Sequence, residues 1–221
     1  MNIQKVLFFG ITDLAQIIYH FLKNDNTYEI CGFVVDKKFM PNKKYIFNKP
    51  IIDFDVLQRN FSPKEYSFFL CVGYNKMNKP RKQIYNKLKN MGYTVENFIH
   101  KDAKVYTKDI GDGNIFLAGA TIDPYTTIGN GNIFFTDSLL SHHSIMGNFN
   151  FMAVKSCITG HTTIKNNCFF GAHSTIKNGL KINSYTLVGA NSYVCKDTSK
   201  YSVIVPKRSL LLNKLAYQLD I

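Results

Sequence analysis

Two adjacent histidines, His142 and His143, are the residues of this chain whose type best suits proton transfer. The imidazole pKa lies near neutral pH, so histidine is the side chain that most often serves as a general acid or base. The pair lies in a region rich in Gly, Asn, Ser and Thr that contains no glutamate, since all three glutamates precede residue 100. Without further context, a solvated surface pair is the alternative interpretation.

A six-residue repeat surrounds the histidine pair. Every sixth residue is apolar at fifteen consecutive positions without an insertion. These positions are Ile110, Phe116, Ile122, Ile128, Phe134, Leu140, Met146, Met152, Ile158, Ile164, Phe170, Ile176, Ile182, Val188 and Val194. A period of six fits neither strand alternation nor an α-helix, and it is typical of a parallel β-helix in which each hexad is one short strand and a turn. Three hexads form a coil of 18 residues, so the repeat predicts five coils.

Residues 18 apart stack on neighbouring coils of such a solenoid. His143 is therefore predicted to lie over His161, and Asp137 over Lys155 in a salt bridge. A column of asparagines is predicted to join the coils by hydrogen bonds; its members are Asn130, Asn148 and Asn166.

The first 100 residues have a different pattern, typical of a small α/β unit. The predicted elements are strands over 6–9, 30–35, 68–72 and 94–98, and helices over 12–22 and 81–91. Alternating strands and helices predict a parallel sheet with a ligand crevice at the C-terminal ends of its strands. The expected parts are 1–100 as the α/β unit, 101–206 as the solenoid and 207–221 as a C-terminal helix. The two outer parts are expected to cap the ends of the solenoid.

Polar residues at the predicted strand ends could hold a nucleotide. Gly10 ends the first strand, but one glycine without GxGxxG does not favour a dinucleotide site, although a helix N-terminus there can hold a phosphate. Asp36 ends the second strand, where a carboxylate meets ribose hydroxyls. Gly73 and Asn75 follow the third strand, and the guanidinium of Arg81 could form two hydrogen bonds to a phosphate. A plain loop aspartate and a solvated arginine are the alternatives.

Composition limits the partners and the compartment. Lys and Arg number 27 and Asp and Glu 15, which leaves +12 spread over both halves without a basic tail. Anionic small molecules fit this charge; a nucleic-acid face would need outward aromatics, whereas the repeat phenylalanines point inward. Five scattered cysteines without a CxxC pair predict reduced thiols and a cytoplasmic location. No signal peptide or apolar run of about 18 residues is seen, so no membrane partner is expected.

Together these features resemble the left-handed β-helix (hexapeptide-repeat) sugar acyltransferases. The more specific likeness is to the branch of sialic acid O-acetyltransferases and nucleotide-aminosugar N-acetyltransferases. Besides the hexads, it rests on the segments 9–10, 35–36, 72–81, 99–103, 141–147 and 168–172. The resemblance implies an α/β Rossmann-like nucleotide-sugar-binding domain, a left-handed parallel β-helix, a short C-terminal helix, and a homotrimer with acetyl-CoA between neighbouring solenoids.

The resemblance also implies roles for single residues. His142 matches the catalytic base, and His143 stands where some members carry an acidic residue that orients the imidazole. The positions that match the nucleotide-sugar side are Gly10, Thr12, Asp36, Gly73, Asn75 and Arg81. The positions that match the coenzyme A side are Phe151, Ala172, Ala190, Lys207 and Arg208.

The implied function is acetyl-CoA-dependent N-acetylation of a nucleotide-linked amino sugar in surface-glycan (lipopolysaccharide) biosynthesis. The His-x4-His spacing of zinc-binding solenoid carbonic anhydrases is absent, so no metal is expected. Two alternatives stay open. The same machinery could acetylate a sugar hydroxyl, or the solenoid could bind a nucleotide-sugar or a partner without catalysis.

Overall fold

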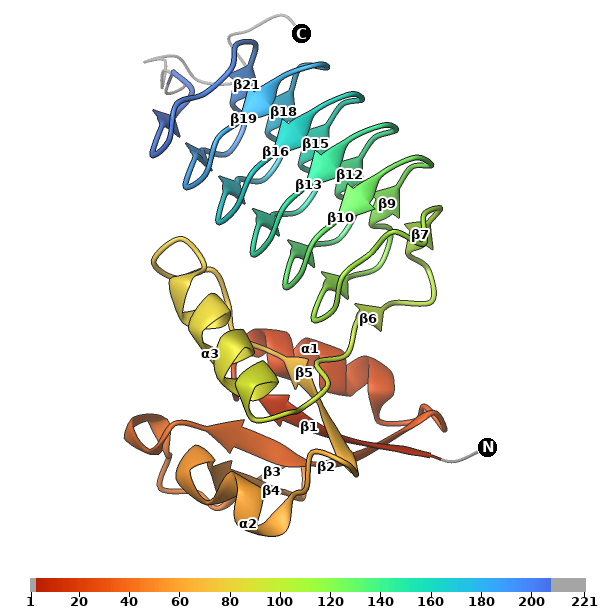
Figure 1. Cartoon of the computed structure of the whole chain (residues 1–221), viewed down its shortest axis with the longest axis vertical. Coiled ribbons are helices and arrows are strands. Elements are labelled where there is room, and N and C mark those ends of the chain that lie inside the picture. Colours follow the sequence, from red (N-terminus) through yellow and green to blue (C-terminus); the bar gives the residue numbers. More distant parts are fainter. Residues whose placement is uncertain (1–2, 208–221) are drawn as a thin grey trace, which may run out of the picture.

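A computed structural model describes residues 3–207 of the chain (Figure 1). An α/β unit built from the N-terminal part lies against a solenoid of short parallel strands that ends near residue 204. Apart from Lys207, the predicted C-terminal helix lies outside the described residues. Among the helices of residues 3–207, none has the length and apolar character needed to cross a membrane.

The α/β unit is built on a five-stranded sheet in the order β3-β4-β2-β1-β5. The strands are β1 (Gln4–Phe9), β2 (Tyr28–Val35), β3 (Tyr45–Ile46), β4 (Lys49–Asp53) and β5 (Tyr66–Leu70). The helices are α1 (Asp13–Leu22), α2 (Leu57–Asn60) and α3 (Lys79–Asn90), with 3-10 turns at Lys37–Phe39 and Phe54–Val56. Four strands run parallel, and only the edge strand β3 is antiparallel. β1 ends in a run of four buried apolar residues, as a parallel strand covered on both faces requires.

Three of the predicted strands and both predicted helices are confirmed, with their ends shifted by at most two residues. Thr12 caps α1 by accepting a hydrogen bond from the amide of Ala15 at 3.4 Å. The strand predicted over 94–98 is wrong: Val95 forms a single bridge to Phe68, and Phe98–Ile99 belongs to the solenoid. Strands β3 and β4 were not predicted, because Lys, Asn and Pro interrupt their apolar pattern.

The solenoid consists of two-residue strands that stack into three parallel sheets (Figure 1). The seven-stranded sheet contains β6 (Phe98–Ile99), β8 (Ile115–Phe116), β11 (Ile133–Phe134), β14 (Phe151–Met152), β17 (Phe169–Phe170), β20 (Leu187–Val188) and β22 (Val203–Ile204). The six-stranded sheet contains β7 (Lys104–Val105), β9 (Thr121–Ile122), β12 (Leu139–Leu140), β15 (Cys157–Ile158), β18 (Thr175–Ile176) and β21 (Tyr193–Val194). The four-stranded sheet contains β10 (Thr127–Ile128), β13 (Ile145–Met146), β16 (Thr163–Ile164) and β19 (Lys181–Ile182).

One apolar side chain from each hexad fills the inside of the solenoid. The repeat positions from Phe116 to Val194 are all buried, at 0–4% exposed, and Ile110 packs against them. Strands pair with a register of 18 residues, so that Phe116 lies beside Phe134 with ring centroids 4.8 Å apart. The six-residue repeat and the 18-residue coil predicted from the sequence are therefore confirmed.

Two columns of asparagine tie the coils together. In the predicted column, the amide of Asn130 donates to Oδ1 of Asn148 and the amide of Asn148 to Oδ1 of Asn166, both at 2.7 Å. A second column, missed in the sequence, is almost fully buried and accepts hydrogen bonds from backbone amides of the next coil. Its members are Asn114, Asn132 and Asn150. These side chains satisfy backbone donors at corners where strand pairing stops.

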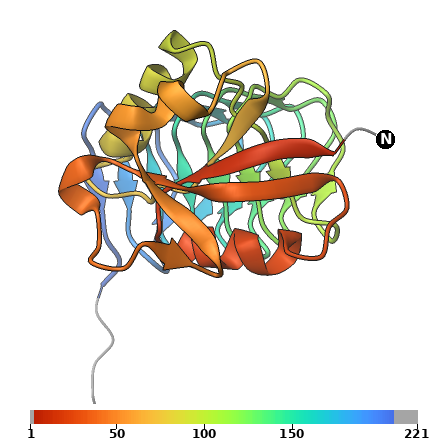
Figure 2. The same cartoon turned by 90° about the horizontal axis from the view of Figure 1, so that it is seen from below.

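The α/β unit packs along the side of the solenoid and not on its end, which corrects the expectation of a cap. Helix α1 and its sheet contact the outward apolar residues of four successive strands of the seven-stranded sheet. Those residues are Ile115, Ile133, Phe151 and Phe169. Figure 2 shows the strands of the α/β unit lying across the coils.

Arg81 joins the two parts and is fully buried, at 0% exposed. On the side of the α/β unit, its Nη1 group donates to the carbonyls of Leu70 and Val72, at 2.6 and 2.8 Å. On the side of the solenoid, Nε donates to Gly131 at 2.7 Å and Nη2 to Gly113 at 3.0 Å. Four backbone carbonyls thus share one guanidinium, whose planar fork of donors suits this arrangement.

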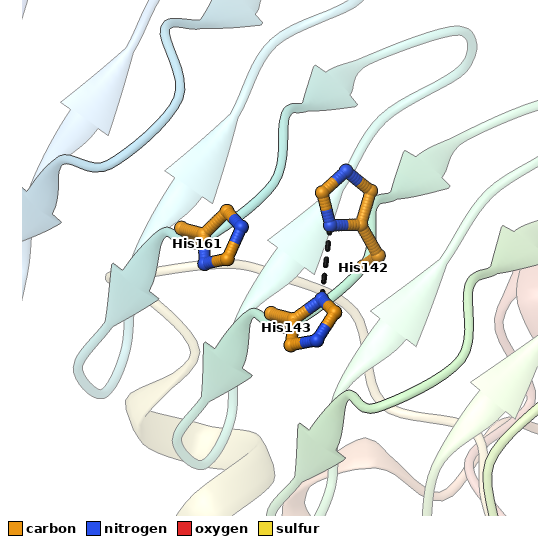
Figure 3. A group of neighbouring side chains, drawn as sticks. All are labelled: His142, His143 and His161. Carbon is orange, nitrogen blue, oxygen red and sulfur yellow. Dashed lines mark hydrogen bonds between the residues drawn. The ribbon is translucent and has the colours of Figure 1, made fainter.

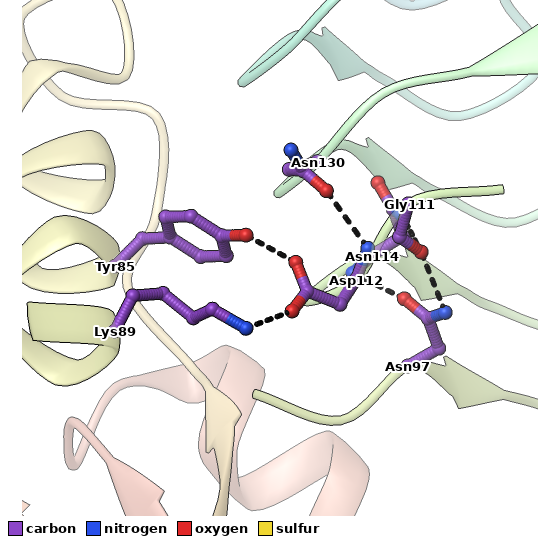
Figure 4. A network of polar contacts seen from close by, with 7 residues as sticks. All are labelled: Tyr85, Lys89, Asn97, Gly111, Asp112, Asn114 and Asn130. Atoms are coloured by element: carbon purple, nitrogen blue, oxygen red, sulfur yellow. Dashed lines mark hydrogen bonds and ion pairs between the residues drawn. The ribbon is translucent and has the colours of Figure 1, made fainter. Parts of the chain in front are cut away.

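A polar network beside Arg81 continues the contact (Figure 4). Asp112 of the first coil accepts hydrogen bonds from the Tyr85 hydroxyl and from Nζ of Lys89, both on α3. The amide of Asp112 donates to Asn130, the first member of the predicted column. Burial, and then the hydrogen bond to Asp112, raise the pKa of Tyr85, so the phenol remains a donor.

Candidate active site

His142 and His143 lie on the corner that follows β12, between the six-stranded and four-stranded sheets (Figure 3). His161 occupies the same corner one coil further on, and its amide donates to the carbonyl of His142 at 3.0 Å. His143 and His161 have positive φ angles of 57° and 58°, as does Tyr125 on the preceding coil. The corner therefore turns through a left-handed residue that directs three successive rings to the same place.

The rings at this corner pack tightly although they are exposed. His143 stacks on His161 with centroids 4.8 Å apart and planes 14° from parallel, which confirms the stacking predicted from the coil length. Its other face lies against Tyr125, also at 4.8 Å. His142 stands at 85° to both histidines.

Nδ1 of His142 and Nδ1 of His143 are 3.0 Å apart, a hydrogen bond in which one nitrogen must donate and the other accept. When His142 donates, its Nε2 carries the lone pair. Among residues 3–207, no group hydrogen-bonds to that Nε2, and the side chain is exposed. The pair can therefore present a basic nitrogen to a molecule bound at the corner.

Gly160 lies beneath the ring of His142. A Cβ atom at this position would lie 2.6 Å from Cε1 and 2.8 Å from Nε2 of His142. The φ angle of Gly160 is not positive, so the glycine serves to leave space and not to permit the backbone turn. The imidazole of His142 can thus lie close against the next coil.

Within the described residues, no carboxylate pairs with His142. The predicted ion pair between Asp137 and Lys155 does not form there either, so that expectation is wrong. The carboxylate of Asp137 lies instead over Gly119, on the corner that precedes β12. Among residues 3–207, His143 is the side chain that hydrogen-bonds to His142.

Three of the residues expected near coenzyme A lie at or just past one corner of the solenoid, whereas Phe151 lies elsewhere. Ala172 and Ala190 share the corner between the seven-stranded and six-stranded sheets, and Lys207 is an exposed residue just past that corner on the last coil. The coils touch there through their backbones, because a Cβ on Gly171 would lie 2.4 Å from the amide nitrogen of Ala190. Arg208 lies outside the described residues.

Phe151 does not fit a coenzyme site, which corrects that expectation. It is 4% exposed and lies under the α/β unit, with its ring 5.3 Å from that of Phe169 and 4.6 Å from that of Tyr74. An outward residue of the seven-stranded sheet is part of the contact between the two parts of the chain, so it is covered by protein.

Three of the residues expected to hold the nucleotide-sugar meet at the C-terminal edge of the parallel sheet. The Thr12 hydroxyl donates to the carbonyl of Cys71 at 2.8 Å. Gly10 has φ 112°, and a Cβ there would lie 2.7 Å from the same carbonyl, so only glycine fits. Gly73 follows with open space around its Cα. The ends of β1 and β5 are thus held together beside an open backbone segment.

Asp36, Asn75 and Arg81 lie at the same edge, but the guanidinium of Arg81 is buried and fully engaged. Asp36 follows β2, with its carboxylate 3.7 Å from Nζ of Lys87 on α3. Asn75 is exposed and precedes residues 76–78, which all have positive φ. The prediction that Arg81 binds a phosphate is wrong, because its buried donors bind the four carbonyls described above.

Burial makes three of the five cysteines poor nucleophiles. All five are unpaired, as predicted. Burial raises the pKa of Cys71 to about 12 and that of Cys168 to about 11. Desolvation also raises the pKa of Cys157, the cysteine on the six-stranded sheet. A thiolate is the reactive form, so these thiols are inert near neutral pH.

Solved structures share this architecture. The acetyltransferase domain of PglB from Neisseria gonorrhoeae, solved in complex with acetyl coenzyme A, is 21% identical with a TM-score of 0.77, covering 89% of this chain and 93% of that chain. A mutant of perosamine N-acetyltransferase from Caulobacter crescentus, in complex with CoA and GDP-perosamine, is 20% identical with a TM-score of 0.80, covering 91% and 93%. The chain has the fold of these acetyltransferases.

This acetyltransferase fold includes both parts of the chain, since each match covers about nine-tenths of both proteins. WeeI from Acinetobacter baumannii has it too, at 14% identity and a TM-score of 0.66, covering 91% of this chain and 94% of that chain. No protein-family model matches the chain. The stacked parallel sheets of a β-helix, which the sequence resemblance implied, are confirmed.

Proposed function

We propose that the chain is an acetyl-CoA-dependent N-acetyltransferase that acts on the amino group of a nucleotide-linked amino sugar. The observation that carries the proposal is His142, exposed on a corner of an acetyltransferase fold, held at Nδ1 by His143 and open at Nε2. The substrate class is supported by the ligands of two similar structures, acetyl coenzyme A in one and CoA with GDP-perosamine in the other.

In the proposed reaction, His142 takes a proton from the sugar amino group as the nitrogen attacks the thioester carbonyl carbon. The amide C–N bond forms, the C–S bond breaks, and the CoA thiolate leaves and collects a proton. His143 accepts the Nδ1 hydrogen of His142 and so keeps the lone pair on Nε2. Backbone amides at the corner are the candidate donors to the oxyanion.

The two parts of the chain would each hold one substrate. We assign residues 1–100 as a Rossmann-like nucleotide-sugar domain, 101–206 as a left-handed β-helix and 207–221 as a C-terminal helix. The proposed nucleotide-sugar residues lie at the C-terminal edge of the parallel strands, the usual ligand side of such sheets. They are Gly10, Thr12, Asp36, Gly73 and Asn75.

We also propose a homotrimer in the cytoplasm that serves surface-glycan biosynthesis. The proposed coenzyme positions, Ala172, Ala190 and Lys207, lie on the corner that precedes the six-stranded sheet, whereas His142 lies on the corner that follows it. Within one chain a strand therefore separates the two sites. A neighbouring copy could place its corner with Ala172 and Ala190 beside His142. The reaction would then require an assembly of several chains.

Thermal-shift measurements test the proposed substrates. We expect acetyl-CoA and one amino sugar linked to UDP, GDP or dTDP each to raise the unfolding temperature. At a hundredfold excess over Kd, the stabilisation is about 2.7 kcal/mol. For a chain of this size that corresponds to a rise of roughly 5–11 °C. Failure of acetyl-CoA to shift the transition would contradict the proposal.

Gly160→Ala is expected to lower kcat by about 100-fold, because the methyl group would take the place of the His142 ring and move the base by more than 1 Å. The ring is exposed and can swing aside, so the free energy of unfolding should change by less than about 1 kcal/mol. Steady-state kinetics and thermal unfolding measure the two effects. On a His142→Ala background the same change should have no further effect on kcat. Wild-type turnover in Gly160→Ala would show that the position of His142 does not matter.

A further inference from the structure

We propose that His142, His143 and His161 together bind one divalent transition-metal ion such as Zn²⁺, and that the bound ion inhibits the acetyl transfer. The three side chains come from one corner on two adjacent coils, and all are exposed (Figure 3). One ring nitrogen from each lies within 4.8 Å of the others. The site is formed by the 18-residue coil, which brings His161 beside a histidine pair far from it in sequence.

The distances suit a tetrahedral ion once the ring of His161 turns out of its stack on His143, because a metal ion lies near the plane of each imidazole that binds it. Zn–N bonds of about 2.0–2.1 Å place tetrahedral ligand nitrogens about 3.3–3.4 Å apart. The Nδ1 atoms of His142 and His143 are already 3.0 Å apart, and an ion that binds both would replace the hydrogen between them. His161 has to approach by no more than roughly 1.5 Å. Because its ring is exposed, this rotation buries and exposes little.

The donor set selects the type of ion. Three neutral imidazoles suit Zn²⁺, Cu²⁺ and Ni²⁺, whereas Mg²⁺ and Ca²⁺ need oxygen ligands. Stacking against Tyr125 restricts the ring of His143, which would lie in the middle of the site. Three protein nitrogens would leave the fourth position of a tetrahedral ion to water.

The metal would occupy the nitrogens that the proposed reaction needs. A metal ion on His142 takes a lone pair of the base and breaks its hydrogen bond to His143. This consequence rests on the proposed function, whereas the binding of the metal does not. Zn²⁺ is therefore expected to inhibit turnover, and a chelator is expected to restore it. The sequence predicted no metal because it lacks the His-x4-His spacing. In the structure, the adjacent pair His142 and His143 and their neighbour His161 on the next coil bring three histidines together without that spacing.

Calorimetric titration of the full chain with ZnCl₂, after removal of metals with EDTA, tests the site. We expect one Zn²⁺ per chain. His161→Ala should weaken binding at least about 100-fold, since even changes outside the ligand set cost about 10–100-fold. His20→Ala is the matched control, because His20 is an exposed histidine on α1. Circular dichroism checks that both variants keep the fold. With Co²⁺ in place of Zn²⁺, the visible spectrum of a four-coordinate site should lack thiolate charge transfer, which excludes the exposed Cys195 as a ligand.

Absence of stoichiometric binding, or equal Zn²⁺ affinity in His161→Ala and wild type, would overturn the metal site. Binding is measured without acetyl-CoA or sugar, so this result is independent of the proposed function. Turnover that persists unchanged at saturating Zn²⁺ would overturn the inhibition alone. If the chain binds Zn²⁺ but acetylates no amino sugar, the metal site is supported and the proposed acetyltransferase function is contradicted.

Discussion

His142→Ala is expected to lower turnover by at least about 100-fold, the scale on which a general base contributes. The imidazole is exposed, so its loss removes little packing. The free energy of unfolding should stay within about 0.5 kcal/mol of wild type, which is a shift of no more than roughly 2 °C. Steady-state release of the CoA thiol and a thermal melt measure the two quantities on the same preparation.

Two further variants separate catalysis from general damage. His20→Ala removes an exposed histidine from α1 and should leave turnover unchanged. His143→Asp keeps an acceptor for the Nδ1 hydrogen of His142, so it should retain more activity than His143→Ala. Wild-type turnover in His142→Ala would show that another group takes the proton.

Arg81→Lys is expected to destabilise the chain by at least about 3 kcal/mol. The ammonium group is compact and cannot reproduce a planar fork that reaches carbonyls on two sides. Each buried carbonyl left without a partner costs about 1–3 kcal/mol. For a chain of this size the unfolding temperature should fall by roughly 6–12 °C. Scanning calorimetry or a thermal melt measures the change.

Arg59→Lys, the same substitution at an exposed arginine of α2, is the control and should leave the unfolding temperature unchanged. The experiment also separates two roles for Arg81. A phosphate-binding arginine would raise KM for the nucleotide-sugar without loss of stability. An Arg81→Lys protein with wild-type stability and a raised KM would contradict the structural role.

The solenoid and the histidine corner could be predicted because the repeat is local and regular. The inward apolar residue recurs every six positions, so the coil length and the stack of His143 on His161 follow from counting. The hydrogen bond between His142 and His143 could not be predicted in this way. It depends on side-chain rotation at a left-handed corner, and the six-residue period carries no information about side-chain rotation.

The errors at Arg81 and Phe151 share one physical cause. Both lie where the α/β unit meets the solenoid, and a period of six says nothing about which sheet is covered. A signal was present in the outward strand positions. On the other two sheets most of them are polar, whereas on the seven-stranded sheet they are apolar in five successive coils. Those five residues are Ile115, Ile133, Phe151, Phe169 and Leu187.

N-acetylation of a nucleotide-linked amino sugar is tested by one assay with two nucleotide-sugars that differ only in carrying an amino or a hydroxyl group at the same carbon. Each is incubated with acetyl-CoA, and the products are identified by mass spectrometry. We expect wild type to add one acetyl group to the amino sugar and to leave the hydroxyl sugar unchanged, and we expect His142→Ala to form almost no product. Acetylation of the hydroxyl sugar, or of no amino sugar in a panel covering UDP, GDP and dTDP, would contradict the proposed N-acetylation.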